Sequence, residues 1–254
     1  MSRTRAHEHH CTALEAEIRR FAEAGAQAGP APAVPTCPGW TVGKLLKHVG
    51  ITHRWVEHIV RNRLTEPVRP RDVPAGVPED EKDYPRWIAE GGAVLVDTLR
   101  ATPLDVPVWS WSDGRDAGTW SRRMLFETAV HRADAEFALG LEPRVEAALA
   151  VDGVDEFLGN LAAAGRFVAA LRELDDHGTL HFHATDVEGG EWMVTLAPER
   201  FIWAHGHGKG DVAVRGAASD LLLLIYGRVP PSDPRYQVFG DTGLLGRWLE
   251  KTAF

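Results

Sequence analysis

The feature that most constrains the fold of this 254-residue chain is a change in the spacing of its apolar residues near residue 178. Before that point, apolar residues recur every three to four positions, which places them on one face of a helix. After it, stretches such as "TLHFHATD" and "EWMVTLAP" alternate apolar and polar residues, as half-buried strands do. The chain is therefore expected to be helical first and mixed α+β afterwards.

Four segments of the first part have a helical pattern, and short to medium loops separate them. They cover residues 8–28, 41–62, 79–100 and 122–140. Thr41 and Thr119 are of the residue type that caps a helix N-terminus, and Gly140 is of the type that ends a helix. These signals predict a four-helix bundle in residues 1–143.

Residues 144–254 are predicted to form a second domain, which a helical segment at 145–174 leads into. Strand-like segments follow at 179–186, 191–198, 201–208 and 211–216, and a helix is expected at 217–228. Residues 238–254 are expected to form a last strand or turn and a terminal helix. Ser219 or Asp220 is expected to cap the helix at 217–228. The predicted fold class is α+β with two domains, the second built on an antiparallel sheet.

Composition excludes several function classes. A hydrophobic content of 44% supports a sizeable core, and a formal net charge of −8 disfavours nucleic acid and anionic membranes as partners. No apolar run has membrane-spanning length, and the N-terminus carries no apolar signal region. With only two cysteines, the chain is expected to be cytoplasmic. Its abundance of Arg, Ala, Gly and Pro indicates a GC-rich genome.

One predicted helix carries acid and imidazole groups on its inward face. Glu127 and His131 are four residues apart and Asp134 follows three later, so the three share one side. A buried carboxylate and imidazole are costly unless something satisfies both, and a divalent metal does so. His48 on the second helix would complete a site suited to zinc, with iron or nickel as alternatives. Spacing alone does not favour His48 over His53, and a plain hydrogen-bonded Glu–His pair remains an alternative.

Three segments resemble a known family. "TCPGWTVGKLLKHVG" and "RRMLFETAVHRADAE" are similar to the "CPGWTVxDLxxH" and "RRMxxExxxHRxDAE" segments of the mycothiol-dependent maleylpyruvate isomerase family. The tail, from "GEWMVTL" to "LLGRWLE", is similar to the C-terminal domain of many members. "VGKLL" departs from the family pattern at a surface-like position where an acidic residue is common.

The resemblance implies a DinB-like bundle with a divalent metal, usually zinc, and a sterol-carrier-like second domain. It implies His48, Glu127 and His131 as ligands and mycothiol, a thiol of actinobacteria, as co-substrate. Asp134 is expected to orient His131. The expected activity is addition of a thiolate to an unsaturated or electrophilic small molecule, as an isomerase or a thiol S-transferase.

Arginine is the natural partner of substrate and thiol carboxylates. Arg215 and Arg228 are therefore candidates for catalysis, and Arg122 and Arg123 are candidates for binding the thiol co-substrate, although most arginines are solvated or salt-bridged. Cys37 is interpreted as a loop residue rather than a ligand. The tryptophans at 109, 111 and 120 are expected to line a pocket or belong to the core.

Two other function classes stay open at this point. A non-catalytic protein could hold a metal or a small ligand in the same fold, and a closed set of four protein ligands would favour it. A hydrolase using metal-activated water is the weaker option. The chain is expected to act on small molecules, as a monomer or small homo-oligomer.

Overall fold

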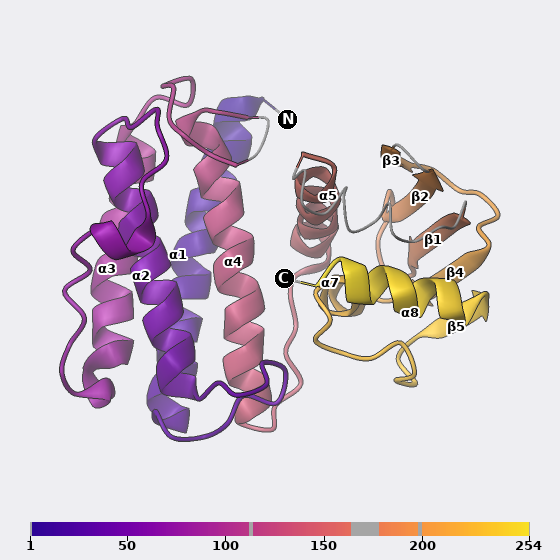
Figure 1. The fold of residues 1–254 in the computed structure, drawn as a ribbon, viewed down its shortest axis with the longest axis horizontal. Helices are drawn as coiled ribbons and strands as arrows, with labels where there is room; N and C mark the ends of the chain where they lie inside the picture. The colour runs from indigo at the N-terminus through magenta and orange to yellow at the C-terminus, as the bar shows by residue number, and fades with distance from the viewer. Residues whose placement is uncertain (1, 112–113, 164–177, 198–199, 254) are drawn as a thin grey trace. The chain divides into compact units, whose positions relative to one another are not determined.

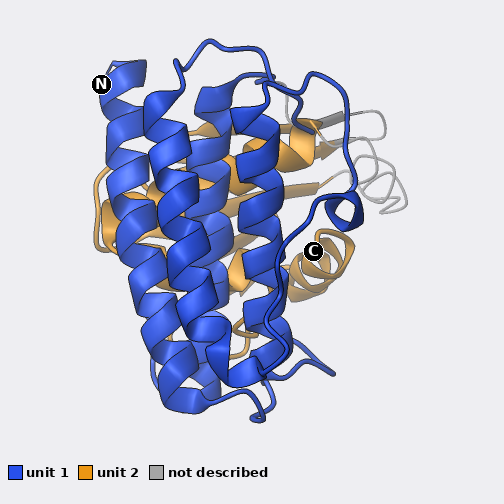
Figure 2. Ribbon diagram, turned by 90° about the vertical axis from the view of Figure 1, so that its left-hand side faces the viewer, with its two compact units in different colours: residues 1–143 blue, residues 144–254 orange. Residues whose placement is uncertain are grey.

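The computed structural model describes residues 2–111, 114–163, 178–197 and 200–253. These residues form two compact units, Met1–Pro143 (unit 1) and Arg144–Phe254 (unit 2), which Figure 2 distinguishes by colour. Among the described residues, no helix combines the length and apolar character needed to cross a membrane.

Unit 1 is a bundle of four long helices lying side by side (Figures 1 and 2). The helices are α1 (Arg3–Ala28), α2 (Val42–Arg61), α3 (Tyr84–Ala101) and α4 (Ala117–Ala138). Two short 3-10 turns, η1 (Pro70–Asp72) and η2 (Glu81–Asp83), lie in the α2–α3 connection. α1 and α2 each pack against both α3 and α4. The predicted four-helix bundle is confirmed.

Of the three predicted cap and stop residues, two are confirmed, but α1 begins at Arg3 rather than near residue 8 and α3 begins at Tyr84 rather than near residue 79. The Thr41 side chain caps α2 by accepting from Lys44 N, and Gly140 follows α4 with a φ of 72°. The prediction of Thr119 as the cap of α4 is wrong, because Asp116 occupies that position and accepts from Thr119 N. An isolated bridge between Pro107 and Asp116 fixes where the helix begins.

Four tryptophans pack together beside α2 and α4. Trp111 stacks on Trp55 with ring centroids 5.7 Å apart and an angle of 11° between the rings, and Trp109 meets Trp55 edge to face. Trp120 is 1% exposed, whereas Trp111 is 43% exposed. These contacts assign the cluster chiefly to the core, the second of the two expected roles.

Unit 2 contains a five-stranded sheet and three described helices. The strands are β1 (Gly178–Ala184), β2 (Glu191–Ala197), β3 (Arg200–His205), β4 (Val212–Gly216) and β5 (Gln237–Gly240). The helices are α5 (Ala147–Ala163), α7 (Ala218–Ile225) and α8 (Thr242–Lys251). The strand order is β3-β2-β1-β4-β5, antiparallel except for the parallel pair β1–β4. The later part of the predicted 145–174 helix lies outside the described residues.

The sheet has an apolar face and a polar face. On the apolar face, Phe182 contacts Trp248 of α8, and the Trp192 indole donates to Asp155 of α5. Residues that alternate with Phe182 point to the other face, so His181 and His183 lie on the polar face. The mixed α+β class predicted from the sequence is confirmed.

The predicted cap of α7 is wrong. Ala217 is the N-cap and makes no side-chain cap bond. Ser219 instead accepts from Val145 N, and the carboxylate of Asp220 pairs with Arg144 and Arg235. Both side chains therefore connect α7 to neighbouring segments of unit 2 rather than to its own first turn.

Candidate metal centre

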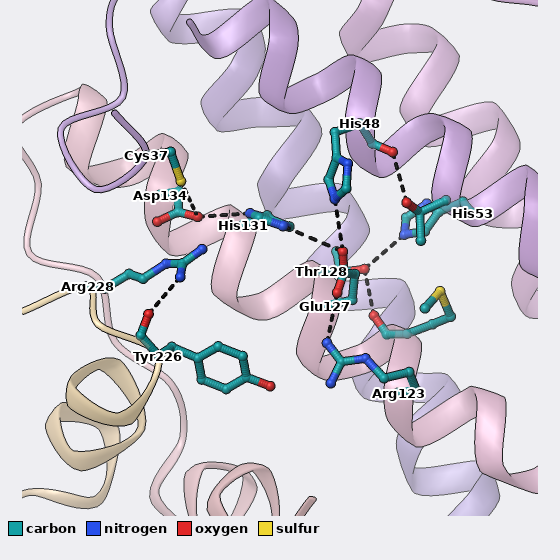
Figure 3. A network of polar contacts seen from close by, with 12 residues as sticks. Cys37, His48, His53, Arg123, Glu127, Thr128, His131, Asp134, Tyr226 and Arg228 are labelled. Atoms are coloured by element: carbon teal, nitrogen blue, oxygen red, sulfur yellow. Dashed lines mark hydrogen bonds and ion pairs between the residues drawn. The ribbon is translucent and has the colours of Figure 1, made fainter. Parts of the chain in front are cut away.

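Three donor side chains from two helices converge in unit 1. This bundle triad consists of His48 on α2 and of Glu127 and His131 on α4. His48 Nε2 lies 3.2 Å, and His131 Nε2 lies 3.5 Å, from the same Glu127 oxygen, Oε1. One donor atom from each residue lies within 4.8 Å of the other two, and Figure 3 shows the side chains pointing toward one another.

Helix geometry explains the convergence. Glu127 and His131 are one turn apart, so their side chains project from the same side of α4. His48 follows the fully buried Leu45 by three residues and borders the apolar stripe with which α2 packs in the bundle. The Trp40 ring meets the His48 ring edge to face, with centroids 5.2 Å apart. The two helices thus present the three donors to one point.

The electrostatics of the bundle triad depend on mutual pairing. Burial alone would raise the pKa of Glu127, but hydrogen bonds with His131 and His48 and the charge of Arg123 hold it well below its usual range. Burial would lower the pKa of His131, but the carboxylates of Asp134 and Glu127 raise it to about 9. Glu127 is therefore an anion, ready to act as a ligand.

Asp134 holds the far side of His131. Its Oδ2 lies 2.8 Å from His131 Nδ1, on the opposite side of the ring from Glu127, as the sequence predicted. Thr36 donates to Asp134 Oδ1, and the Cys37 thiol donates to Oδ2 at 3.4 Å. Asp134 is buried, so this network fixes both its position and the orientation of the His131 ring.

Cys37 lies closer to this centre than a simple loop role implied. Cys37, His131 and Asp134 also offer donor atoms within 4.8 Å of one another, which makes them a second candidate ligand set sharing His131. Sequence reasoning missed this contact, and Thr36 with it, because a loop residue has no periodicity to show where it points. The nearest signal was the position of Cys37 within the quoted "TCPGW" segment.

His53 is separate from the bundle triad. It is fully buried, and its Nε2 lies 2.9 Å from Thr128 Oγ1. Within the described parts of the chain, its Nδ1 has no hydrogen-bond partner. Burial lowers the pKa of His53 to about 4, so the ring is neutral at neutral pH. The structure thus separates the two histidines that spacing alone did not distinguish.

Two arginines precede the bundle triad on α4. Arg123 is buried, and its Nη2 donates to Glu127 Oε2 at 2.8 Å, so it holds the oxygen that the imidazoles do not contact. Arg122 lies half-buried beside it in sequence. Their predicted role in binding the thiol co-substrate stays a prediction.

The other two candidate arginines belong to unit 2. Arg215 is exposed on β4, where it pairs in register with His183 of β1. Arg228 is half-buried just after α7 and donates from Nη1 to the carbonyl of Tyr226 at 2.6 Å (Figure 3). Their predicted catalytic roles also stay predictions.

The donors of the bundle triad suit a divalent cation. Two imidazoles and one carboxylate are a ligand set that zinc, iron and nickel accept. Both imidazoles point an Nε2 atom at the same oxygen of Glu127. A cation placed between these three donor atoms would be bound by all three groups. With three protein ligands, coordination positions remain for water or a substrate atom.

The fold and the site together define a class: a helical bundle with a candidate metal centre between two helices, followed by an α+β unit. Residues 11–136 match the model of the mycothiol maleylpyruvate isomerase N-terminal domain, and residues 148–247 match the MDMPI C-terminal domain. The chain belongs to the mycothiol-dependent maleylpyruvate isomerase family.

A solved structure supports the same fold. A histidine-to-alanine mutant of the mycothiol-dependent maleylpyruvate isomerase aligns with a TM-score of 0.55, covering 90% of this chain and 93% of that one. Sequence identity is 14%, so the likeness concerns the fold alone. Comparison with curated protein sequences gives no match.

Proposed function

We propose that the chain is a metal-dependent enzyme that uses mycothiol as a co-substrate. Its mycothiol thiolate would add to an unsaturated or electrophilic small molecule, and the outcome would be cis–trans isomerisation or S-transfer. The observation that carries the proposal is the convergence of His48, Glu127 and His131 within a chain of this family. Maleylpyruvate is the first substrate to test, because the matching solved structure is a maleylpyruvate isomerase.

In this proposal the bundle triad holds one divalent cation, with zinc preferred for two imidazoles and a carboxylate. A bound cation of this kind supplies electrostatic stabilisation to a thiolate at neutral pH. Thiolate formation matters because the thiol form is a poor nucleophile.

The surrounding residues position the ligands. Asp134 accepts from His131 Nδ1, which leaves Nε2 facing Glu127 and the cation position. Arg123 holds the second oxygen of Glu127. Both contacts keep the three donors aimed at one point without adding a fourth protein ligand.

The proposed reaction needs only a thiolate and an activated double bond. The thiolate sulfur adds to one carbon of a cis double bond, and the electron pair of that bond moves onto its activating group. The resulting single bond rotates, and return of the electron pair expels the thiolate and gives the trans isomer. Retention of the new carbon–sulfur bond, with protonation of the neighbouring carbon, gives S-transfer. In this scheme Arg215 and Arg228 bind substrate carboxylates, and Arg122 and Arg123 bind the thiol co-substrate.

A non-catalytic metal-binding role is the second candidate, and the position of Cys37 favours it. If Cys37 or Asp134 joined the bundle triad, the cation would have four protein ligands, the arrangement of structural zinc sites. Against this, Asp134 contacts the Nδ1 side of His131 and not the Nε2 side that faces Glu127.

Turnover measurements test the proposal. The full chain, loaded with zinc, should isomerise maleylpyruvate or form a thioether only when mycothiol is added. His48→Ala should lose this turnover. His58→Ala should retain it, because His58 lies on the same helix but its ring is hydrogen-bonded to Asn62 and not to the bundle triad. Full mycothiol-dependent turnover by metal-stripped protein would refute the proposal, and hydrolysis of a substrate without added thiol would indicate a hydrolase.

A further inference from the structure

A second group of metal-ligand side chains lies in unit 2, on the polar face of the sheet. This sheet cluster consists of His181, His183, Glu191 and His207. The first two alternate along β1 and therefore share a face. Glu191 begins β2 directly opposite His183 in the register, and His207 lies two residues beyond the end of β3.

Three imidazoles of the sheet cluster point at one carboxylate oxygen. Glu191 Oε2 lies 2.7 Å from His207 Nδ1, 3.0 Å from His181 Nε2 and 3.5 Å from His183 Nδ1. The three rings lie within 5.3–6.3 Å of one another, centroid to centroid. One donor atom from each of the four residues lies within 4.8 Å of all the others.

This arrangement is poor as a hydrogen-bond network but good as a ligand set. A carboxylate distributes its acceptor capacity over two oxygens, yet all three contacts use the same one. Donor atoms around a tetrahedral zinc ion lie about 3.4 Å apart, given bond lengths of about 2.0–2.1 Å. The distances from Glu191 Oε2 to the three imidazole nitrogens lie on both sides of that spacing.

We propose that the sheet cluster binds one divalent first-row cation, with zinc the preferred ion. Three imidazoles and one carboxylate supply four protein ligands, the number that structural zinc sites use. The sheet cluster shares no residue with the proposed reaction, although Arg215 lies beside His183 in the register of β4 and β1. It would join the first two strands of the sheet to the segment that follows the third.

The segment that carries His207 is already built to lie close to the sheet. A side chain at Gly210 would place its Cβ 2.7 Å from the Val212 carbonyl oxygen and 3.0 Å from His181 N, so only glycine fits there. Asp211 accepts from both the backbone N–H and the hydroxyl of Thr179. These contacts bring the segment beside β1, while the His207 side chain stays 77% exposed and accessible to an ion.

Zinc titration of the full, untagged chain tests the site. Wild type is expected to bind two equivalents, and His48→Ala is expected to keep the one held by the sheet cluster. In wild type or in His48→Ala, adding His207→Ala should remove one zinc equivalent or lower the zinc affinity of the sheet cluster at least about 100-fold. Loss of a residue that only supports a ligand already costs about 10–100-fold in affinity, and His207 is itself a proposed ligand. His207 is exposed, so this substitution does not disturb a core.

His205→Ala is the matched control. It removes a histidine two residues away whose ring contacts Asp155 of α5 on the apolar face and the backbone carbonyl of Glu191, but not the Glu191 carboxylate, so zinc binding should not change. Zinc should also raise the melting temperature of His48→Ala but not of the His48→Ala, His207→Ala double variant. Unchanged zinc affinity in the double variant, or an equal loss in His205→Ala, would overturn the proposal, since the ion would then be held elsewhere.

Discussion

At the residue scale, contacts within one helix were predictable and contacts between segments were not. Glu127, His131 and Asp134 meet because residues three and four apart share a helix face, which the sequence shows directly. His48 and His53 are five residues apart, about 140° around the axis, yet choosing between them needed the position of α4. The contact of Cys37 with Asp134 depends on loop geometry that no periodicity reveals.

Asp134→Asn tests the support that the buried carboxylate gives to His131. The amide keeps the size of the side chain but loses the charge that orients the imidazole, so zinc affinity of the bundle triad should fall about 10–100-fold. Competition with a chelator of known affinity measures the change. Glu136→Gln is the control, because Glu136 pairs with Arg132 and Arg20, away from His131. An unchanged affinity in Asp134→Asn would contradict the assigned role.

His53 should make stability depend on pH. Its pKa is about 4 in the folded chain and 6.5 ordinarily, so between these values the unfolded chain binds a proton that the folded chain does not. Stability from this group is present above pH 6.5 and is lost as pH falls toward 4, by about 3 kcal/mol in total. Denaturant unfolding of metal-free protein at pH 7 and pH 4.5 measures the loss. His53→Gln should lose less stability than wild type over this range, and an equal loss would contradict the assignment.

At the element scale, the type and order of the helices and strands were predictable, because long periodic segments carry a strong signal. The residues at which the helices begin were less predictable. Asp116 replaces Thr119 as the cap of α4 because a bridge with Pro107 sets the chain's approach to the helix. The parallel pairing of β1 with β4 was also invisible, since alternation shows that a strand exists but not which strand lies beside it.

Gly50 controls how closely α2 approaches α3. A Cβ at this position would lie 2.0 Å from the Trp87 ring, and Arg54 covers the same ring at 4.1 Å from its centroid. Gly50→Ala should therefore destabilise the chain by about 1–3 kcal/mol, despite the better helix propensity of alanine. Thermal or denaturant unfolding measures the difference.

Gly159 of α5 provides the matched control for Gly50. Nothing lies within 4 Å of a Cβ built there, so Gly159→Ala should be neutral or stabilise the chain by up to about 1 kcal/mol. If both alanine variants changed stability alike, the steric account of the α2–α3 contact would be wrong.

At the scale of the whole molecule, the order of helical and strand-like segments predicted the fold class, and the motif resemblance predicted the family. The sheet cluster escaped prediction although "HFH" and "HGH" stand in the sequence. It requires the register that sets His183 opposite Glu191 and the turn that returns His207 to the same face. Neither can be obtained from local alternation.

The proposed function assigns the binding of substrate carboxylates to Arg215 and Arg228. Arg228→Ala and Arg215→Ala should each raise the KM for substrate at least about tenfold, because losing a charged hydrogen bond costs about 1.5–3 kcal/mol, and should leave the bundle triad's metal content unchanged. Steady-state kinetics with metal analysis measures both. Arg86→Ala, at an exposed site in the bundle, is the control. Unchanged KM values in both variants would remove these arginines from the proposed reaction.

Anomalous diffraction at the zinc edge, on crystals of the full chain grown with zinc, tests the central claim most directly. The account predicts a peak bonded to His48 Nε2, Glu127 and His131 Nε2, with a non-protein atom, from water or an added thiol, in the remaining position. A zinc ion with Cys37 or Asp134 as its fourth ligand, or no anomalous peak at the bundle triad, would contradict it.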